Sequence, residues 1–184
     1  MKHLRTAILY TLVSAVFLGL GYPLAMTMLA HWLFPRQANG SLITRDGKVI
    51  GSSLIGQSFS GPGYFHGRPS AAGNGYDASS SGGSNLAPSN HALIARVQAS
   101  VAAEQVGTGK VPIDLVTASA SGLDPDITPA AAYYQAPRVA VARHLPFGVV
   151  KALVAKHITS RQFGLLGEAR LNVLELNLAL DQMH

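Results

Sequence analysis

Four residues in the middle of the chain, Ser81, Gly82, Gly83 and Ser84, are of types that can surround a phosphate group. Glycine lets backbone amides approach an anion closely, and serine hydroxyls add hydrogen-bond donors. The four residues open the uncharged stretch SGGSNLAPSN, residues 81–90. The same composition suits a flexible linker or an ordered turn before a helix, so its role depends on where the segment lies.

SGGS is similar to the signature loop with which ABC-type ATPases contact a nucleotide phosphate in trans. Four residues also suit a glycine turn whose hydroxyls cap the following helix. A second glycine-rich stretch, GTGK at residues 107–110, fails as a P-loop, because that motif needs glycine and Ser or Thr where this chain has Glu104 and Val111. We interpret GTGK as a helix stop followed by a turn.

The sequence gives little support for a hydrolytic site or a metal-binding site. The hydroxyl-rich TASASG lacks the first glycine of G-x-S-x-G, and no histidine has a predictable position beside Ser119 or Ser121. The seven histidines form no i,i+4 pair, so no catalytic or metal-binding residue is predicted. Asp124 and Asp126 could form an acidic pocket for a cation, but we favour ordinary turn and cap chemistry. The sequence Asp-Lys-Thr-Gly-Thr of phosphorylated P-type pump subunits does not occur.

The N-terminal region predicts a membrane-spanning helix. No residue from Thr6 to Pro35 carries a fixed charge, and about 20 apolar residues suffice to cross the hydrocarbon core. A cleaved signal peptide has an apolar region of only about 7 to 15 residues and a small-x-small cleavage site. This run is longer, and its best cleavage candidate, before His31, has Met28 at the minus-three position. Lys2 and Arg5 favour a cytoplasmic N-terminus, although Arg36 and nearby basic residues argue the other way.

Small residues on this helix indicate where a neighbouring helix could approach. Ala15, Gly19 and Pro23 are spaced by four and are expected on one face. Tyr10 and Trp32 fall near the two ends, where amphipathic rings settle at the headgroup level. A lipid-exposed anchor is the alternative, because glycine is common in membrane helices.

Charge and cysteine content limit the function classes. The net charge is +5, but three of the fourteen basic residues precede residue 37, and the rest are scattered without a basic run. A nucleic-acid-binding face is therefore not predicted. The chain has no cysteine, which excludes disulfides and thiolate metal sites.

The remaining 150 residues predict an α+β domain. A hairpin is expected about Asp46-Gly47, and the aromatic residues of the Gly/Ser/Pro-rich stretch 57–89 argue against a flexible linker. A helix capped by Ser89 or Asn90 is expected with a stop at Gly107, and a second helix is expected after Thr128-Pro129 until Pro137 restarts or kinks the chain. Short helices are expected over RVAVARHL and PFGVVKALVAKHI. LNVLELNLAL is interpreted as a strand, with a buried helix as the alternative.

Taken together, these segments resemble the C subunit of the Kdp-type potassium-transporting ATPase (the KdpC family), nearly end to end. The segments that carry the resemblance are the single N-terminal span, LIGQSFSGPGYFHGRPSA, SGGSNLAPSN, VPIDLVTASASGLDPDITPAAA, RVAVAR and GLLGEARLNVLELNLALD. The family usually has glycine at the position of Ala120 and histidine at that of Asp126. A positive φ at 120 and a histidine role in that loop therefore do not carry over.

The resemblance implies a bacterial inner-membrane complex that uses ATP and potassium ion, with a channel-like potassium-binding subunit and a P-type ATPase subunit as partners. In that arrangement residues 1–6 form a cytoplasmic tail, 7–34 the transmembrane helix and 35–184 a mixed α/β extracytoplasmic (periplasmic) domain. The chain itself is expected to bind no cofactor. It would be a non-catalytic accessory subunit that stabilises the complex and caps or shapes the potassium entrance.

Two alternatives remain from other function classes. The first is a catalytic chaperone that raises the ATP affinity of the P-type subunit, with nucleotide bound at Ser81, Gly82, Gly83 and Ser84. The second is a membrane-tethered hydrolase that would depend on Ser119 or Ser121. A domain outside the membrane cannot meet cytoplasmic ATP, so topology decides between direct nucleotide contact and a structural role.

Overall fold

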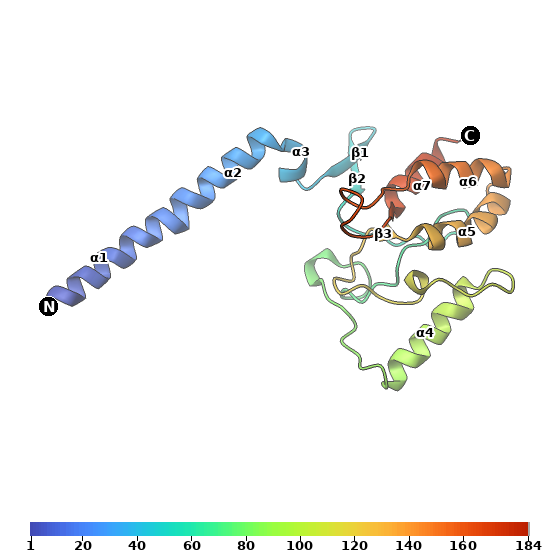
Figure 1. Cartoon of the computed structure of the whole chain (residues 1–184), viewed down its shortest axis with the longest axis horizontal. Coiled ribbons are helices and arrows are strands. Elements are labelled where there is room, and N and C mark those ends of the chain that lie inside the picture. The colour runs from blue at the N-terminus through green and yellow to red at the C-terminus, as the bar shows by residue number, and fades with distance from the viewer. Residues whose placement is uncertain (184) are drawn as a thin grey trace. The chain divides into compact units, whose positions relative to one another are not determined.

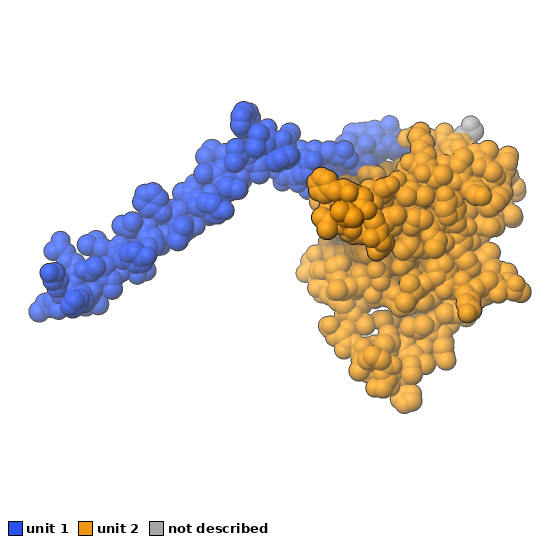
Figure 2. Space-filling view, viewed as in Figure 1, with its two compact units in different colours: residues 1–50 blue, residues 51–184 orange. Residues whose placement is uncertain are grey.

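The computed structural model describes residues 1–183, and its internal contacts divide the chain into two units, residues 1–50 and residues 51–184 (Figure 2). The architecture is mixed helix and strand with one long apolar helix at the N-terminus, as the sequence predicts. The boundaries expected at residues 6/7 and 34/35 refer to a membrane and stay predictions.

The first unit is dominated by one continuous helix from Lys2 to Leu33 (Figure 1). It consists of α1 (Lys2–Val16), the π-helical turn η1 (Phe17–Gly21) and α2 (Tyr22–Leu33), followed by the short α3 (Pro35–Ala38). Strands β1 (Leu42–Arg45) and β2 (Lys48–Ser52) form the expected hairpin. Its turn residues Asp46 and Gly47 have φ of 51° and 75°, the left-handed pair that a tight hairpin needs.

The second unit is built around three helices and a two-stranded ribbon. Helix α5 (Pro129–Ala142) packs on α6 (Phe147–Lys156), which packs on α7 (Val173–Asp181). Strands β3 (Asp126–Ile127) and β4 (Leu171–Asn172) pair antiparallel, with Ile127 opposite Leu171. The remaining elements are η2 (Ala78–Ser80), α4 (His91–Glu104) and η3 (Ile113–Leu115). The core is formed by Phe65, Leu115, Ile127, Ala132, Val139, Val150, Val154, Leu171, Leu176 and Leu180, among others.

Helix α5 begins as predicted but does not stop at Pro137. The Thr128 hydroxyl accepts a hydrogen bond from the amide of Ala131 at 3.3 Å, and Pro129 takes the first position. The helix continues through Pro137 to Ala142, so RVAVARHL supplies its second half and is not a separate helix. Ala136, Val139 and Ala140 are buried, so we attribute the tolerance of a central proline to tertiary packing.

The C-terminal prediction of a strand is wrong beyond its first two residues. Only Leu171 and Asn172 pair as a strand, and α7 follows at once. The Asn172 side chain accepts a hydrogen bond from the Glu175 amide at 3.1 Å and so caps the helix. The buried residues Val173, Leu176, Asn177 and Leu180 follow the i, i+3, i+4, i+7 spacing of a helix face. The helical alternative is therefore correct for most of the segment.

Candidate functional site

The SGGS stretch is an ordered segment fixed to the TASASG loop. The Gly82 amide donates a hydrogen bond to the carbonyl of Ser121 at 2.8 Å, and the Ser81 hydroxyl donates to the same carbonyl at 3.0 Å. The Ser70 hydroxyl donates to the neighbouring carbonyl of Gly122 at 2.6 Å. These bonds make SGGS a structured loop, as its turn interpretation requires, and leave the Gly82 amide occupied.

Gly122 is needed where these loops meet, and Gly83 also lies in a tight position. Gly122 has φ +66°, and a Cβ placed on it would lie 2.6 Å from both the amide nitrogen of Ala72 and the carbonyl oxygen of Gly82. A Cβ on Gly83 would lie 3.2 Å from the Ala120 carbonyl oxygen, whereas one on Gly82 would meet nothing within 4 Å. The left-handed conformation of this loop is at Gly122 and not at Ala120, so the alanine at position 120 is accommodated.

The SGGS loop does not cap the helix that follows it. An irregular segment, residues 85–90, separates Ser84 from the start of α4 (Figure 1). The α4 N-terminus is capped by Asn90, whose side-chain oxygen accepts a hydrogen bond from the Ala92 amide at 2.8 Å. The prediction that Ser89 or Asn90 caps this helix is confirmed for Asn90. The helix ends at Glu104, and Gly107 follows in a left-handed conformation.

The two serines considered for hydrolysis contact each other. Their hydroxyl oxygens are 3.3 Å apart, and the Ser121 oxygen also accepts a hydrogen bond from the Leu123 amide at 3.1 Å. The ring nitrogens of His66 do not contact these serines: Nδ1 lies 2.8 Å from the Glu104 carboxylate and Nε2 lies 3.1 Å from the carbonyl oxygen of Gly61. The geometry of this loop is that of an ordered turn.

Asp124 and Asp126 occupy structural positions beside two arginines. Asp124 pairs with Arg68 at 3.2 Å and accepts a hydrogen bond from the Asp126 amide at 3.0 Å. Asp126 pairs with Arg170 at 3.0 Å, across the β3–β4 ribbon. The described residues contain no cluster of three acidic or histidine side chains that could hold a metal ion. The hydrogen bond from the Asp126 amide to Asp124 is turn chemistry of the kind that we favoured, whereas the two arginine pairs were not predicted.

Burial raises the pKa of Asp126, and the negative charges of Asp124 and Glu175 raise it further, while Arg170 lowers it. A cavity of about 280 Å³ adjoins this carboxylate and is also lined by His157 and Glu175. The net rise in the pKa means that the ionised form of Asp126 is less favourable in the folded state, even with its arginine partner.

Arg68 links this acidic pair to the TASASG loop. Its guanidinium donates to the carbonyls of Thr117 at 3.3 Å and Ala118 at 3.4 Å. The Tyr76 hydroxyl in turn donates to the Arg68 carbonyl at 2.5 Å. Burial, the larger cause, and the charge of Asp124 raise the pKa of Tyr76, which keeps this phenol a hydrogen-bond donor.

The aromatic loop over residues 57–77 is held by polar groups that sequence reasoning missed. Phe65 is fully buried, as expected for a loop that has apolar surface to bury. Its amide donates to the Asn177 side chain at 2.8 Å, and its carbonyl accepts from the same side chain at 2.9 Å. Gln135 forms the equivalent pair with the backbone of His66, at 2.7 and 3.1 Å. A single amide side chain inside each apolar helical run was the available signal.

Two arginines, one in α5 and one at its C-terminal end, also bind the backbone of this loop. Arg138 donates to the carbonyls of Pro62 and Tyr64 at 2.7 and 3.1 Å. Arg143 donates to the Gly63 carbonyl at 2.8 Å, pairs with Asp181 at 2.6 Å and lies 4.4 Å from the centre of the Tyr64 ring. The loop is therefore a fixed part of the second unit.

The three small residues of the N-terminal helix lie around its π-helical turn. Ala15 is in α1, Gly19 in η1 and Pro23 in α2, and all three are exposed. The Tyr22 amide donates to the Phe17 carbonyl, five residues earlier, which is the π-helical pattern. In a regular α-helix residue i+4 lies about 40° ahead of residue i. We infer that the wider π turn reduces this drift and so keeps the three residues closer to one face.

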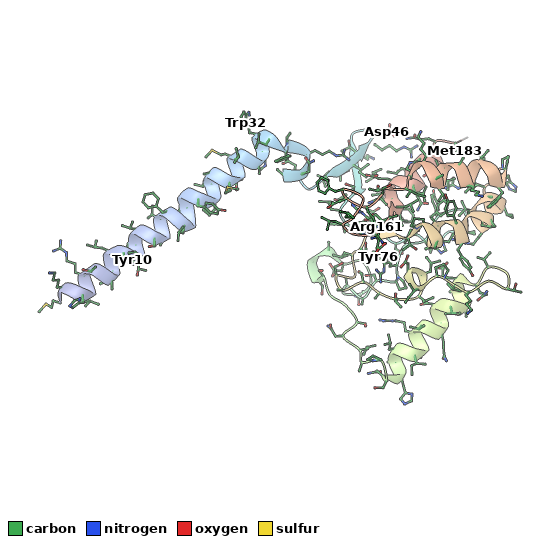
Figure 3. The ribbon with its side chains drawn as sticks, viewed as in Figure 1. Tyr10, Trp32, Asp46, Tyr76, Arg161 and Met183 are labelled. Carbon is green, nitrogen blue, oxygen red and sulfur yellow. The ribbon has the colours of Figure 1, made fainter. Side chains whose placement is uncertain are left out.

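The aromatic residues of this helix are spaced for a bilayer. Tyr10 and Trp32 are both mostly exposed along it (Figure 3). At 1.5 Å per residue they are separated by about 33 Å, close to the thickness of the hydrocarbon core. The continuous helix of 32 residues is long and apolar enough to span a membrane.

A family model described as K+-transporting ATPase, c chain, matches residues 4–182. The chain belongs to the KdpC family. It is 77% identical over 184 residues to the potassium-transporting ATPase KdpC subunit of Acidobacterium capsulatum, with 100% of both chains covered. It is 57% identical over 187 residues to the KdpC subunit of Gemmatimonas aurantiaca, covering 100% of this chain and 94% of the relative. The KdpC subunit of Methylococcus capsulatus is 56% identical over 188 residues, with 100% and 99% covered.

KdpC membership confirms the resemblance drawn from the sequence and makes the chain a subunit of a potassium-transporting ATPase complex. The candidate membrane helix is consistent with a membrane-anchored KdpC subunit. Membership in a multi-chain ATPase also implies partner subunits.

Proposed function

We propose that this chain is a non-catalytic accessory subunit of a high-affinity, ATP-driven potassium uptake complex. Its helix crosses the bacterial inner membrane once, with the N-terminus in the cytoplasm, and packs against the channel-like subunit. Its second unit lies outside, stabilises the complex and caps or shapes the potassium entrance. ATP is hydrolysed by the P-type ATPase subunit of the same complex.

The observation that carries this proposal is the exposed apolar helix. None of the residues from Lys2 to Val16 or from Tyr22 to Leu33 is buried within the chain, and an 18-residue window of this helix has a mean hydropathy of 1.8. Such a surface needs lipid or another membrane helix around it. The carboxylates of Asp124 and Asp126 are engaged by arginines, which is what a structural role predicts.

The catalytic-chaperone alternative has less support at the residues proposed for it. The Gly82 amide, the natural donor to a phosphate oxygen, already donates to Ser121. Binding of a phosphate there would first have to break this hydrogen bond. Ser81 has an exposed side chain but shares the same carbonyl acceptor.

Topology is the first test, because it separates the two roles. The chain has no cysteine, and Ser80 and Gly109 are exposed, so Ser80→Cys and Gly109→Cys each create one accessible thiol. We expect an impermeant maleimide to label both variants in cells whose outer membrane has been permeabilised and whose inner membrane is intact. Labelling only after lysis would place the loop on the ATP side and favour the chaperone.

The accessory role itself is tested by omission of the chain. We expect the remaining subunits to assemble poorly or to lose potassium uptake. Normal assembly together with normal transport in the absence of this chain would contradict the proposal.

A further inference from the structure

An ordered loop with an exposed apolar tip projects from the second unit between α6 and β4. We call residues 159–170 the finger. Thr159 pairs with Arg170 through hydrogen bonds of 2.8 and 3.0 Å, and Gln162 pairs with Leu166 through two of 2.9 Å. The finger is therefore a preformed hairpin and not a flexible connection.

Its tip places three large apolar side chains in solvent. Phe163 is 93% exposed, Leu165 is 80% exposed and Leu166 is 60% exposed. Phe163 also has φ +53°, beside Gly164 at +73°. The left-handed region disfavours a bulky residue that is not glycine. Neither burial nor local backbone preference accounts for phenylalanine here, and backbone strain of this kind is concentrated at ligand-contacting sites.

We propose that the finger is a docking element that inserts Phe163 into an apolar, uncharged pocket on another subunit of the complex. This inference rests on the proposed function, because it requires the chain to act by binding its partners. Aromatic residues are enriched among the anchors of protein interfaces. A loop already held in one shape loses little conformational entropy when it enters a shaped pocket.

The charges of the finger favour a protein partner over a lipid surface. Both of its arginines are paired, Arg161 with Glu168 at its neck and Arg170 with Asp126 at its base (Figure 3 labels Arg161). The finger therefore presents no unpaired cation for anionic headgroups, whereas membrane-surface segments are typically rich in lysine and arginine beside their apolar face.

Photocrosslinking in the assembled complex tests the partner. Phe163→p-benzoylphenylalanine keeps an aromatic ring at the tip, and the same replacement at Val141, which is 77% exposed on α5, is the control. We expect an adduct with another subunit from position 163 and none from position 141. Adducts with lipid alone, with a second copy of this chain alone, equal adducts from both positions, or no adduct would overturn the proposal.

A second variant separates docking from folding. Phe163→Gly removes the ring and relieves the left-handed backbone, so the thermal midpoint of the isolated full chain should stay the same or rise. Retention of the chain in the purified complex should nevertheless fall roughly tenfold, and Phe163→Leu should restore part of it. Suppose that the complex fails to assemble or transport without the chain but retains Phe163→Gly normally. That result would refute the docking role of the finger and leave the proposed function standing. If the complex assembles and transports normally without the chain, the proposed function fails and the finger with it.

Discussion

Gln135 on α5 and Asn177 on α7 hold two consecutive residues of one loop, and each uses both ends of its side-chain amide. Gln135 bonds to the amide and carbonyl of His66, and Asn177 bonds to those of Phe65. Both amide side chains are buried, at 0% and 1% exposure. Two helices thus supply to the loop the pairing that a neighbouring strand would supply in a sheet.

We expect Asn177→Leu to destabilise the chain by about 2–4 kcal/mol, because it leaves two buried backbone groups of Phe65 without partners. Chemical denaturation of the full chain in detergent micelles, followed by circular dichroism, measures the free energy of unfolding. Gln98→Leu on the exposed side of α4 is the control and should change stability by no more than about 0.5 kcal/mol. Equal stability of the two variants would show that the loop has other supports.

The aromatic part of this arrangement was predictable, and the amide part was not. Phe59, Tyr64, Phe65 and Tyr76 in a glycine-rich stretch indicated a loop that buries surface. The roles of Gln135 and Asn177 depend on how α5 and α7 pack. One polar residue in an apolar helix can also lie at the edge of a buried face, so its presence alone does not predict that it holds a loop. Residues that meet across a sequence separation of 112 leave no local pattern.

The stability of the folded chain should depend on pH through Asp126, and the sign of this dependence follows from the environment of its carboxylate. Its pKa is raised above the ordinary 3.8, mainly by burial. The folded state therefore binds the proton more tightly, so this group lowers stability as pH rises from about 3.8 through its folded pKa. Asp126→Asn resembles the protonated acid and should gain stability relative to the parent chain across that window. The gain should be constant above it, in denaturation curves measured from pH 3 to 8.

Asp77 is the matched control with the opposite sign. The hydroxyl and amide of Ser79 donate to its carboxylate at 2.6 and 2.9 Å and lower its pKa. Its contribution is present above the ordinary pKa and is lost as pH falls through the lowered one. The free energy of unfolding of Asp77→Asn should therefore decrease relative to that of the parent chain as pH rises through the lowered pKa. The same slope for both variants would contradict these assignments.

The glycines of the loop contact should differ sharply in their tolerance of alanine. Gly122→Ala puts a Cβ 2.6 Å from two backbone atoms at a positive φ and should cost about 1–3 kcal/mol of unfolding free energy. Gly82→Ala meets nothing within 4 Å and should be neutral within about 0.5 kcal/mol. Thermal unfolding of the two single variants checks the difference.

Because Gly82→Ala spares the fold, it also tests the catalytic-chaperone alternative. An unchanged apparent Michaelis constant for ATP in a complex that carries this variant agrees with a structural loop. A clear rise with normal assembly would indicate that nucleotide contacts Gly82.

The C-terminal helix shows why a short apolar run does not by itself predict a strand or a helix. LNVLELNLAL alternates over its first residues, which favours a strand, yet it also satisfies helical spacing from Val173 onward. The cap at Asn172 decides between the two, and its effect depends on β4 ending there against β3. By contrast, the Asp46-Gly47 hairpin and the Asn90 and Thr128 caps were predictable because their geometry is set by neighbouring residues.

The candidate membrane helix carries Ala15, Gly19 and Pro23 around its π-helical turn. Gly19 and Gly21 lie in the same π-helical turn, and a Cβ meets nothing within 4 Å at Gly19 and only the Val16 carbonyl at 3.7 Å at Gly21. The helix itself should thus accept leucine at either position. Residues two apart point to nearly opposite sides of a helix, so only Gly19→Leu obstructs the face that carries Ala15 and Pro23.

We expect Gly19→Leu to reduce recovery of the chain with the complex roughly tenfold, since a close helix contact depends on small residues, while Gly21→Leu is recovered normally. Affinity purification through another subunit, followed by quantification of this chain, measures both. Membrane insertion should be equal for the two variants, because leucine favours the hydrocarbon core. Equal recovery would mean that the helix faces lipid at Gly19, and loss only with Gly21→Leu would place the partner on the opposite face.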